Sequence, residues 1–273
     1  MPHSMQVAVR MRPVIPPIDG EEGEVLGFDE GTHKVQVAVD VHLSRQLKSF
    51  GFDALFGPNR TTDEMYEELV APSVSRLRLG YNMALFAYGQ TGAGKTFTMM
   101  GDPDRRVPGV TTLAFKQMFE EQARSPDQVS TVRVSVMEIY QDVVYDLLNE
   151  CGKVQLKGSG GGGGVMRFDG LVEHRVRSAE EATRIVNRGL EERTQAATYV
   201  HEHSNRSHTI VRVLQETWAE GEGVLLASLL LVDLAGSETV ELQTGQQKEE
   251  GKCINSSVKT SNNVKQPAPQ LIT

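Results

Sequence analysis

Residues 83–100 read MALFAYGQTGAGKTFTMM, and this stretch decides the fold class. It matches the pattern GxxxxGK[ST], with Lys95 and Thr96 at the end of a glycine-rich loop. The apolar run before the loop is typical of a buried strand, and the residues after it are typical of the start of a helix. Strand, loop and helix in this order predict a phosphate-binding loop, because inward-turned N–H groups and a helix N-terminus attract an anion. The predicted loop comprises Gly89, Gln90, Thr91, Gly92, Ala93, Gly94, Lys95 and Thr96.

A second segment, residues 229–238, reads LLLVDLAGSE and complements the phosphate loop. A nucleoside triphosphate site needs a carboxylate near the metal ion and a group that detects the γ-phosphate. Asp233 ends a strongly apolar run, where a metal-facing carboxylate belongs, and Gly236 offers an N–H that no side chain hinders. With Lys95 for the β- and γ-phosphates and Thr96 for Mg²⁺, these residues predict a nucleotide site.

Residues 201–208 read HEHSNRSH and form a third cluster of polar side chains. Three histidines so close together suggest zinc, but their spacings of two and five residues do not match a HExxH pair. The segment offers no further evident zinc ligand. The cluster is therefore interpreted as one that orders water or phosphate.

Apolar, β-branched runs alternate with helical patterns along the chain. Alternation with period two predicts half-buried strands at 6–10 and 34–40. A capping box formed by Ser178 and Glu181 predicts a helix that ends near Gly189. These features predict an α/β fold with helices on both faces of a sheet. The other predicted strands are 83–88, 132–140, 209–214 and 225–233, and the other predicted helices are 62–78 and 111–123.

Composition and charge narrow the classes of function. The chain has 28 Lys and Arg against 36 Asp and Glu, a net charge of -8, which argues against binding to nucleic acid. Two cysteines give neither a disulfide framework nor metal-ligand spacing, which suits a reducing compartment. No run reaches the roughly 18 apolar residues of a membrane span, and the N-terminus lacks the apolar core of a signal peptide. The sequence predicts a soluble intracellular protein with no membrane partner, and its glycine-rich run at 158–164 predicts a surface loop.

Four motifs that follow one another in the expected order resemble the kinesin motor domain. They are GYNMALFAY at 80–88, GQTGAGKT at 89–96, SNRSH at 204–208 and DLAGSE at 233–238. RMRP at 10–13 and FDALFGP at 52–58 are supporting matches. The resemblance implies a P-loop NTPase whose central mixed, mostly parallel sheet has helices on both faces. It implies one motor domain over residues 1–260.

The resemblance also implies roles for individual residues. Arg10, Arg12 and Pro13 would flank the adenine, with Phe97 stacking on it. Residues 204–208 would be switch I and residues 233–238 switch II, whose closure depends on the γ-phosphate. An ion pair between the switches would align water for attack. The implied pair is Arg206 with Glu238, the implied catalytic residues are Lys95, Ser204, Arg206, Gly236 and Glu238, and the implied Mg²⁺ ligands are Thr96 and, through water, Asp233.

By resemblance, the chain would hydrolyse ATP, with Mg²⁺ as cofactor, in a reaction coupled to microtubule binding and movement. Its expected location is the cytoplasm, on the cytoskeleton. Compared with the family, the chain is expected to lack the last strand and the final helices of the motor domain. Its microtubule contact would be weakened accordingly. Residues 261–273 are polar and contain two prolines, and they are expected to form a disordered tail.

Three departures from the family's pattern leave a second interpretation open. His201 stands where the family has Asn, and Asn205 stands where it has the Ser whose hydroxyl helps to hold Mg²⁺. Asp169 replaces the usual Lys in a candidate microtubule-contacting segment, residues 166–177. Together with the expected lack of the C-terminal part of the domain, the departures at positions 201 and 205 favour a non-motile nucleotide-binding module with impaired hydrolysis and weak or no microtubule binding. A P-loop kinase or a small GTPase is disfavoured, because the chain has no NKxD-like guanine signature.

Overall fold

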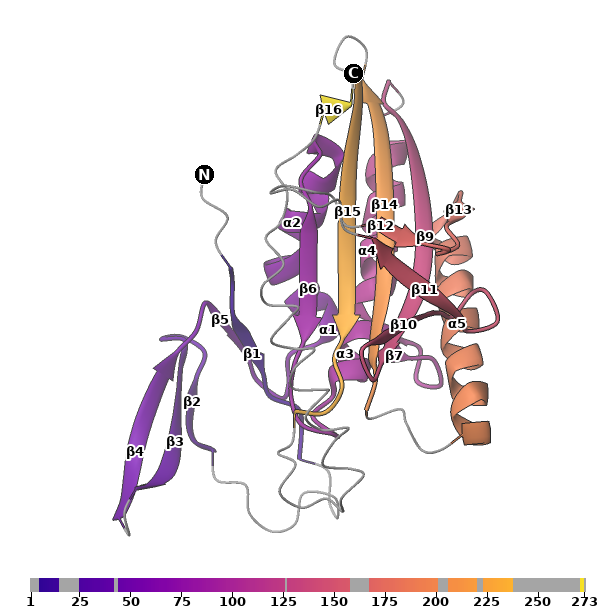
Figure 1. Ribbon diagram of the computed structural model, residues 1–273. Helices are drawn as coiled ribbons and strands as arrows, with labels where there is room; N and C mark the ends of the chain where they lie inside the picture. Colours follow the sequence, from indigo (N-terminus) through magenta and orange to yellow (C-terminus); the bar gives the residue numbers. More distant parts are fainter. Residues whose placement is uncertain are drawn as a thin grey trace. The chain divides into compact units, whose positions relative to one another are not determined.

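The computed structural model describes residues 5–14, 25–41, 44–125, 127–157, 167–200, 206–219, 223–237 and 271–272. The chain divides into two compact units, residues 1–69 and residues 70–273. Figure 1 labels the elements of both units. The glycine-rich run at 158–164, predicted to be a surface loop, lies outside the described residues.

In its described residues, the first unit contains two small sheets and one short helix. Its strands confirm those predicted at 6–10 and 34–40. Helix α1 (Thr62–Met65) begins with a capping box, in which the Thr61 hydroxyl accepts from the Glu64 N–H at 3.2 Å and the Glu64 carboxylate accepts from the Thr61 N–H at 2.7 Å. A parallel pair is formed by β1 (Ala8–Arg10) and β5 (Ala54–Phe56), and an antiparallel sheet by β2 (Val25–Asp29), β3 (Lys34–Val41) and β4 (Ser44–Gly51).

The helical stretch predicted at 62–78 is present but irregular. After α1 the chain passes through a π turn, η1 (Tyr66–Val70), then α2 (Ala71–Val74), and then a 3₁₀ turn, η2 (Ser75–Leu79). Pro72 explains the irregularity, because it has no N–H to donate to the carbonyl four residues earlier and its ring crowds that carbonyl. The stretch ends at Gly80, whose φ of 81° is left-handed.

The second unit is built on a sheet with β9, β14 and β15 at its centre. The sheet is mixed, as predicted, but its described pairings are mostly antiparallel rather than mostly parallel. The reason is local: β14 ends at Ala219 directly opposite Gly223, where β15 begins, and so short a connection permits only antiparallel pairing. The central strands are β9 (Val129–Tyr140), β14 (His208–Ala219) and β15 (Gly223–Asp233), and β6 (Met83–Ala87) pairs in parallel with β15.

Smaller strands extend this sheet on both sides. Within the expected disordered tail, Leu271 and Ile272 form β16, which pairs with Leu225 and Val224 of β15 because an apolar pair can add to that edge. The rest of the tail lies outside the described residues. The other strands are β10 (Val143–Asp146), β11 (Gly152–Lys157), β12 (Arg167–Asp169) and β13 (His174–Val176), and a separate two-stranded hairpin is made of β7 (Gly101–Asp102) and β8 (Val107–Pro108).

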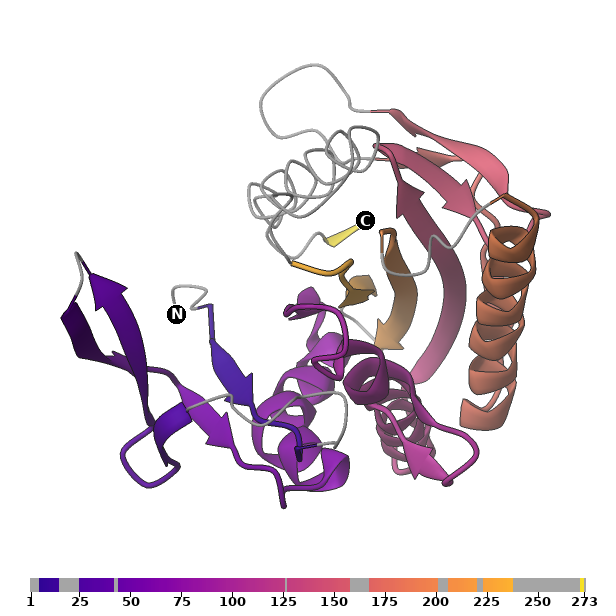
Figure 2. The same cartoon turned by 90° about the horizontal axis from the view of Figure 1, so that it is seen from below.

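Three helices cover one face of this sheet. They are α3 (Lys95–Met100), α4 (Val110–Ala123) and α5 (Ala179–Val200), and Figure 2 shows them on the same side of β9, β14 and β15. The sequence predicts a helical layer on each face of the sheet, and the described ranges contain this layer on one face. Phe86 of β6 is 41% exposed. Among the helices of the described ranges, none combines the length and the apolar character that crossing a bilayer demands.

Helix α5 is longer than predicted. Its start is as expected, since the Ser178 hydroxyl accepts from the Glu181 N–H at 3.2 Å. Its end is at Val200, not near Gly189. A Cβ on Gly189 would lie 3.1 Å from the Cβ of Val136 on β9, so this glycine serves close packing of helix against sheet rather than helix termination.

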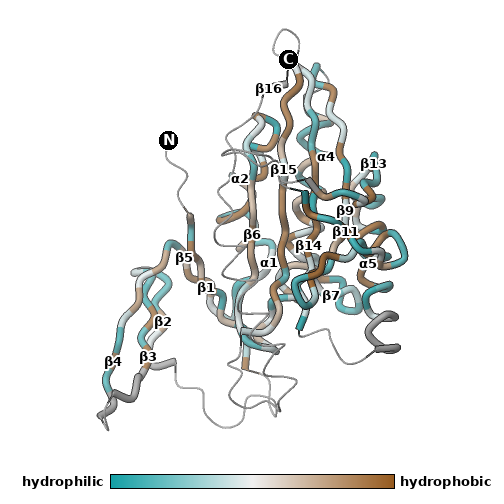
Figure 3. The backbone as a smooth tube through the Cα atoms, in the orientation of Figure 1, coloured by the Kyte–Doolittle hydropathy of each residue, from teal (hydrophilic) through white to brown (hydrophobic). Residues whose placement is uncertain are grey.

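The covered face of β15 leads to the site. Alternate residues Leu229 and Leu231 are buried, and Figure 3 shows the hydrophobic character of this strand. Asp233 continues the same row at the carboxyl end of the strand and is 5% exposed. Its neighbour in the parallel ladder is Ala87, the last residue of β6. The loop that follows β6 therefore starts beside Asp233.

Candidate nucleotide-binding site

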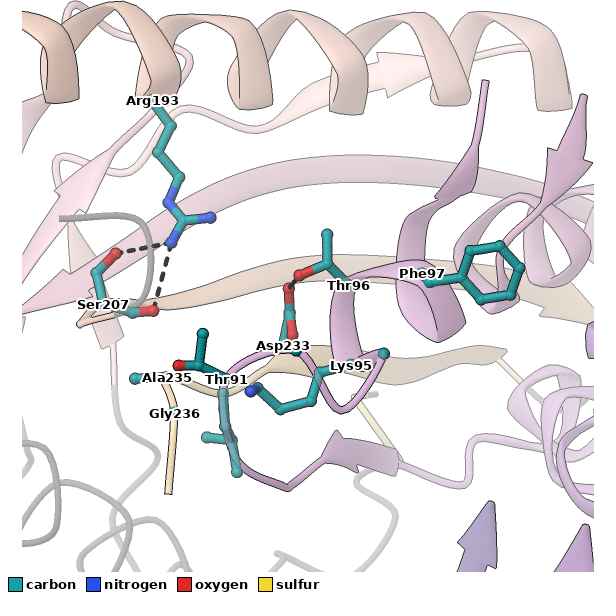
Figure 4. A pocket seen from close by; sticks show the side chains of 12 residues that line it. Thr91, Lys95, Thr96, Phe97, Arg193, Ser207, Asp233, Ala235 and Gly236 are labelled. Carbon is teal, nitrogen blue, oxygen red and sulfur yellow. Dashed lines mark hydrogen bonds between the residues drawn. The ribbon is translucent and has the colours of Figure 1, made fainter. Parts of the chain in front are cut away.

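A cavity of about 210 Å³ opens where β6 and β15 end (Figure 4). The carboxyl ends of neighbouring parallel strands are where open α/β sheets place their ligands. The walls come from the glycine-rich loop, the start of α3, the segment after β15, α5 and the residue before β14. The lining residues are Thr91, Gly92, Gly94, Lys95, Thr96, Phe97, Arg193, Ser207, Asp233, Leu234, Ala235 and Gly236.

The loop from Gly89 to Gly94 follows a path that requires glycine. Gly92 and Gly94 have φ values of 80° and 92°, a region that side chains with a Cβ rarely adopt. The Ala93 N–H donates to the Gln90 carbonyl at 3.1 Å, which closes the turn. The Ser237 N–H donates to the Gly89 carbonyl at 3.1 Å. The loop and the segment after β15 are thus held side by side.

Lys95 lies at the cavity wall and bonds to the loop that precedes it. Its ammonium donates to the carbonyl oxygens of Gly89 and Gln90 at 2.9 and 3.0 Å. These contacts place a positive charge at the mouth of the loop. For the ammonium to contact a phosphate, it would exchange these carbonyl oxygens for phosphate oxygens.

Thr96 and Asp233 meet at the floor of the cavity. The Thr96 hydroxyl donates to Oδ2 of Asp233 at 2.6 Å, across 137 residues of sequence. Oδ1 of Asp233 is buried and has no hydrogen-bond partner within the described residues. Burial raises the pKa of Asp233 above its usual range, while the Thr96 hydrogen bond and the charges of Arg193 and Lys95 act to lower it.

Sequence reasoning missed Arg193, which reaches the cavity from α5. Its Nε donates to Oε1 of Glu138 at 2.9 Å, and its Nη2 donates to the Ser207 hydroxyl at 2.8 Å and to the Ser207 carbonyl at 3.4 Å. Figure 4 shows the two Ser207 contacts. The sequence signal for Arg193 is its place as a charged residue on the continuation of the capped helix beyond Gly189. It was missed because Gly189 was interpreted as the helix end.

His208 joins the start of β14 to the segment that carries Gly236. Its Nδ1 accepts from the Ala235 N–H at 2.9 Å, and the side chain is 4% exposed. Burial lowers the pKa of His208 to about 4; the charge of Arg193 acts in the same direction and that of Asp142 against it. The imidazole is therefore neutral at pH 7 and acts as an acceptor. Among the described residues, no group of three or more His, Cys, Asp or Glu has a metal-binding arrangement.

Four of the predicted site residues are those expected to contact the adenine. Arg10, Arg12 and Pro13 belong to the first unit, where Arg10 donates to the Thr62 hydroxyl at 3.0 Å and Arg12 donates to the Pro13 carbonyl at 3.0 Å. Phe97 lies at the edge of the cavity and is 37% exposed. Their proposed contact with adenine stays a prediction.

The predicted switch residues fall only partly within the described ranges. Gly236 lines the cavity, and Arg206 is described in the turn before Ser207. Ser204 and Glu238 lie outside the described residues, as do His201 and Asn205. The ion pair between Arg206 and Glu238 therefore stays a prediction.

Comparison with known families decides the identity. The family model described as the kinesin motor domain matches residues 10–266, which is most of the chain. The chain belongs to the kinesin motor domain family. Kinesin motor domains are ATPases of the P-loop type that work on the microtubule cytoskeleton. The family predicted from four ordered motifs and the predicted P-loop NTPase fold are therefore both confirmed.

Relatives of this kinesin motor domain are long proteins. It is 37% identical over 259 residues to human centromere-associated protein E, covering 89% of this chain and 9% of that protein. It is 33% identical over 264 residues to the mitochondrial kinesin-like protein KIN-7C of Arabidopsis thaliana, covering 94% of this chain and 28% of that protein. This kinesin motor domain thus spans about a tenth to about a quarter of the length of these two curated relatives.

A solved structure of a fast kinesin superposes on this kinesin motor domain with a TM-score of 0.80 and 34% sequence identity. The match covers 92% of this chain and 72% of that chain. At this identity the likeness extends beyond the fold to the sequence.

Proposed function

We propose that this chain binds ATP with Mg²⁺ and hydrolyses it as a motor ATPase, in a reaction coupled to microtubule binding and movement. The observation that carries the proposal is the hydrogen bond between Thr96 and Asp233. It joins the hydroxyl that follows the phosphate loop to the carboxylate at the end of the neighbouring strand. P-loop NTPases use this pair of groups to hold their metal ion.

The chemistry of this pair fits Mg²⁺. Both groups are hard oxygen donors, which Mg²⁺ prefers, and Oδ1 of Asp233 is a buried acceptor without a partner in the described ranges. Thr96 would hold the ion directly and Asp233 through water. When bound, Mg²⁺ would neutralise charge on the β- and γ-phosphates.

The remaining groups of the site suit a nucleoside triphosphate. Lys95 and the N–H groups of the loop would hold the β- and γ-phosphates, and the N–H of Gly236 would contact the γ-phosphate. Ser204, Arg206 and Glu238 would align the attacking water. Arg10, Arg12, Pro13 and Phe97 would hold the adenine.

The proposed partner is the microtubule, and the proposed location is the cytoplasm, on the cytoskeleton. Arg175 and Arg177 are exposed around β13 and offer positive charge to an acidic filament. Asp169 pairs with Lys157 of β11, so the carboxylate that replaces the family's Lys cancels a neighbouring cation. These charges support a contact that is electrostatic and weak, as expected of exposed ion pairs.

Phosphate release from Mg·ATP tests the proposal, measured with and without microtubules. We expect release that microtubules stimulate, and Lys95→Ala should lower it by about two orders of magnitude by removing the cation that contacts the phosphates. Lys116→Ala removes an exposed lysine of α4 and serves as the matched control. ATP binding without release would refute hydrolysis, and release that microtubules do not change would refute the motor function.

A second candidate function is a non-motile nucleotide-binding module, and Asn205 favours it. Its amide is longer than the Ser hydroxyl of the family and places its oxygen differently. If this residue limits hydrolysis, Asn205→Ser should raise turnover while leaving the affinity for ADP unchanged. An unchanged rate would remove this explanation. His201→Asn, at the other departure in the same segment, is the companion variant.

A further inference from the structure

A row of polar side chains crosses three strands behind the cavity. In the sheet register, Thr209 of β14 pairs with Asp233 of β15 on one side and with Glu138 of β9 on the other. Directly paired residues point to the same face of a sheet. Two carboxylates therefore flank Thr209 on the face that α5 covers. A ligand with several phosphates would meet this concentration of negative charge.

Arg193 is a cation that faces this row from α5. Its guanidinium contacts Glu138 and has a favourable electrostatic interaction with Asp233. The side chains of Arg193 and Glu138 are only 14% and 17% exposed, so water screens their interaction weakly. Arg193 also lines the cavity, whereas Glu138 does not. Glu138 is thus placed to act on the cavity through Arg193.

Ser207 completes a closed triangle with these two residues. Its hydroxyl accepts from Nη2 of Arg193 at 2.8 Å and donates to Oε1 of Glu138 at 2.5 Å. The same carboxylate oxygen accepts from Nε of Arg193 at 2.9 Å. The triangle ties β9, α5 and the residue before β14 together, so Glu138 fixes both the guanidinium and the backbone next to Arg206.

We propose that Glu138 is a positioning residue through which this chain distinguishes ATP from ADP. It holds Arg193 at the cavity wall, where the guanidinium balances Asp233 and supplies positive charge for the third phosphate. Without Glu138, Arg193 would lose its ion-pair partner and turn toward Asp233, the remaining carboxylate of the row. This inference rests on the proposed nucleotide site and specifies how that site detects the γ-phosphate.

Nucleotide binding, without turnover, tests this role. The dissociation constants of fluorescent ADP and of a non-hydrolysable ATP analogue are measured with Mg²⁺ for the wild type, Glu138→Ala, Arg193→Ala and the double variant. Arg193→Ala should weaken the ATP analogue by about 10- to 100-fold, as expected for a charge-assisted hydrogen bond, and ADP by less than about 3-fold. Glu138→Ala should act in the same direction.

The double variant separates positioning from independent effects. If Glu138 acts through Arg193, the double variant will match Arg193→Ala, and the two effects will not add. Additive effects on the ratio of the two dissociation constants would overturn the proposal. So would equal weakening of ADP and the ATP analogue, which is what a merely structural role produces.

Two further variants keep the test decisive. Glu138→Gln retains an oxygen that accepts from Arg193 and Ser207, so it should recover most of the discrimination and replaces Glu138→Ala if that variant does not fold. Glu216→Ala removes a carboxylate that pairs with Arg133 at 2.8 Å and should leave the ratio unchanged. If the wild type binds neither nucleotide, the proposed function fails and this inference with it. If it binds both and the variants do not change the ratio, only the role of Glu138 fails.

Discussion

Acidification from pH 7.5 to pH 5.0 is expected to destabilise the folded chain through His208. An unfolded histidine has a pKa near 6.5, and burial together with the charge of Arg193 lowers the pKa of folded His208 to about 4. Between these values the unfolded chain binds a proton that the folded chain does not. The contribution of His208 to the free energy of unfolding is therefore at its maximum above about pH 7, and it falls as the pH drops through 6.5.

The size of the effect follows from the two pKa values. At pH 5.0 the unfolded histidine is protonated and the folded one is still mostly neutral, which gives a loss of about 2 kcal/mol. Below pH 4 the loss levels off at about 3 kcal/mol, because the folded imidazole then binds its proton as well. Protonation of Nδ1 would also remove the acceptor for the Ala235 N–H.

Urea unfolding at both pH values measures this loss, in the absence of nucleotide. Trp218 on β14, the single tryptophan of the chain, reports unfolding by fluorescence. His208→Asn is the comparison, because the asparagine amide oxygen can accept from Ala235 and does not titrate. The wild type should lose about 2 kcal/mol more than this variant. His33→Asn, at an exposed position, controls for the removal of a histidine, and equal losses in the wild type and His208→Asn would refute the reasoning.

Three further predictions concern stability and use thermal or urea unfolding. Gln141→Asn should stabilise the chain by about 0.5 kcal/mol, because the two-residue turn between β9 and β10 has φ values of 48° and 61°, which Asn adopts more readily; no gain would contradict this account of the turn. Gly101→Ala should lower the free energy of unfolding by about 2 kcal/mol or more, since φ of Gly101 is 87° and a Cβ would lie 2.3 Å from the Val107 carbonyl oxygen. A change near zero would show that the hairpin β7–β8 shifts to make room for the Cβ. Phe115→Ala should cost about 3–5 kcal/mol, because this side chain of α4 is fully buried; a loss below about 1 kcal/mol would mean that the core refills the space.

Local patterns in the sequence predicted that the glycine-rich loop and Asp233 lie at the ends of strands. The glycines at positions 92 and 94 need left-handed backbone, and Asp233 ends an apolar strand, so short-range signals place both segments at strand ends. The sequence assigned Thr96 and Asp233 to one Mg²⁺ site, and in the structure they meet because β6 pairs in parallel with β15. Motif reasoning predicts such placement because the local backbone depends on residues close together in sequence.

Other features depend on contacts between distant segments. Gly189 matches the composition of a helix end, and only the approach of Val136 shows why it lies within α5. Arg193 and Glu138 are separated by 55 residues, and neither belongs to a motif that predicts the other. The antiparallel pairing of β9 with β14 likewise depends on register that period-two alternation does not specify.

The hydrogen bond between Thr96 and Asp233 has a consequence for the order of folding. It closes a loop of 137 residues, and the β6–β15 pairing beside it closes a loop of similar size. Contacts between such distant segments form late, because closing a long loop costs chain entropy before the contacts form. A ligand that contacts both the phosphate loop and β15 would stabilise the closed loop. It would add about 2.7 kcal/mol to the free energy of unfolding when its concentration is 100 times its dissociation constant. During synthesis, the chain would become competent for nucleotide only after β15 has left the ribosome.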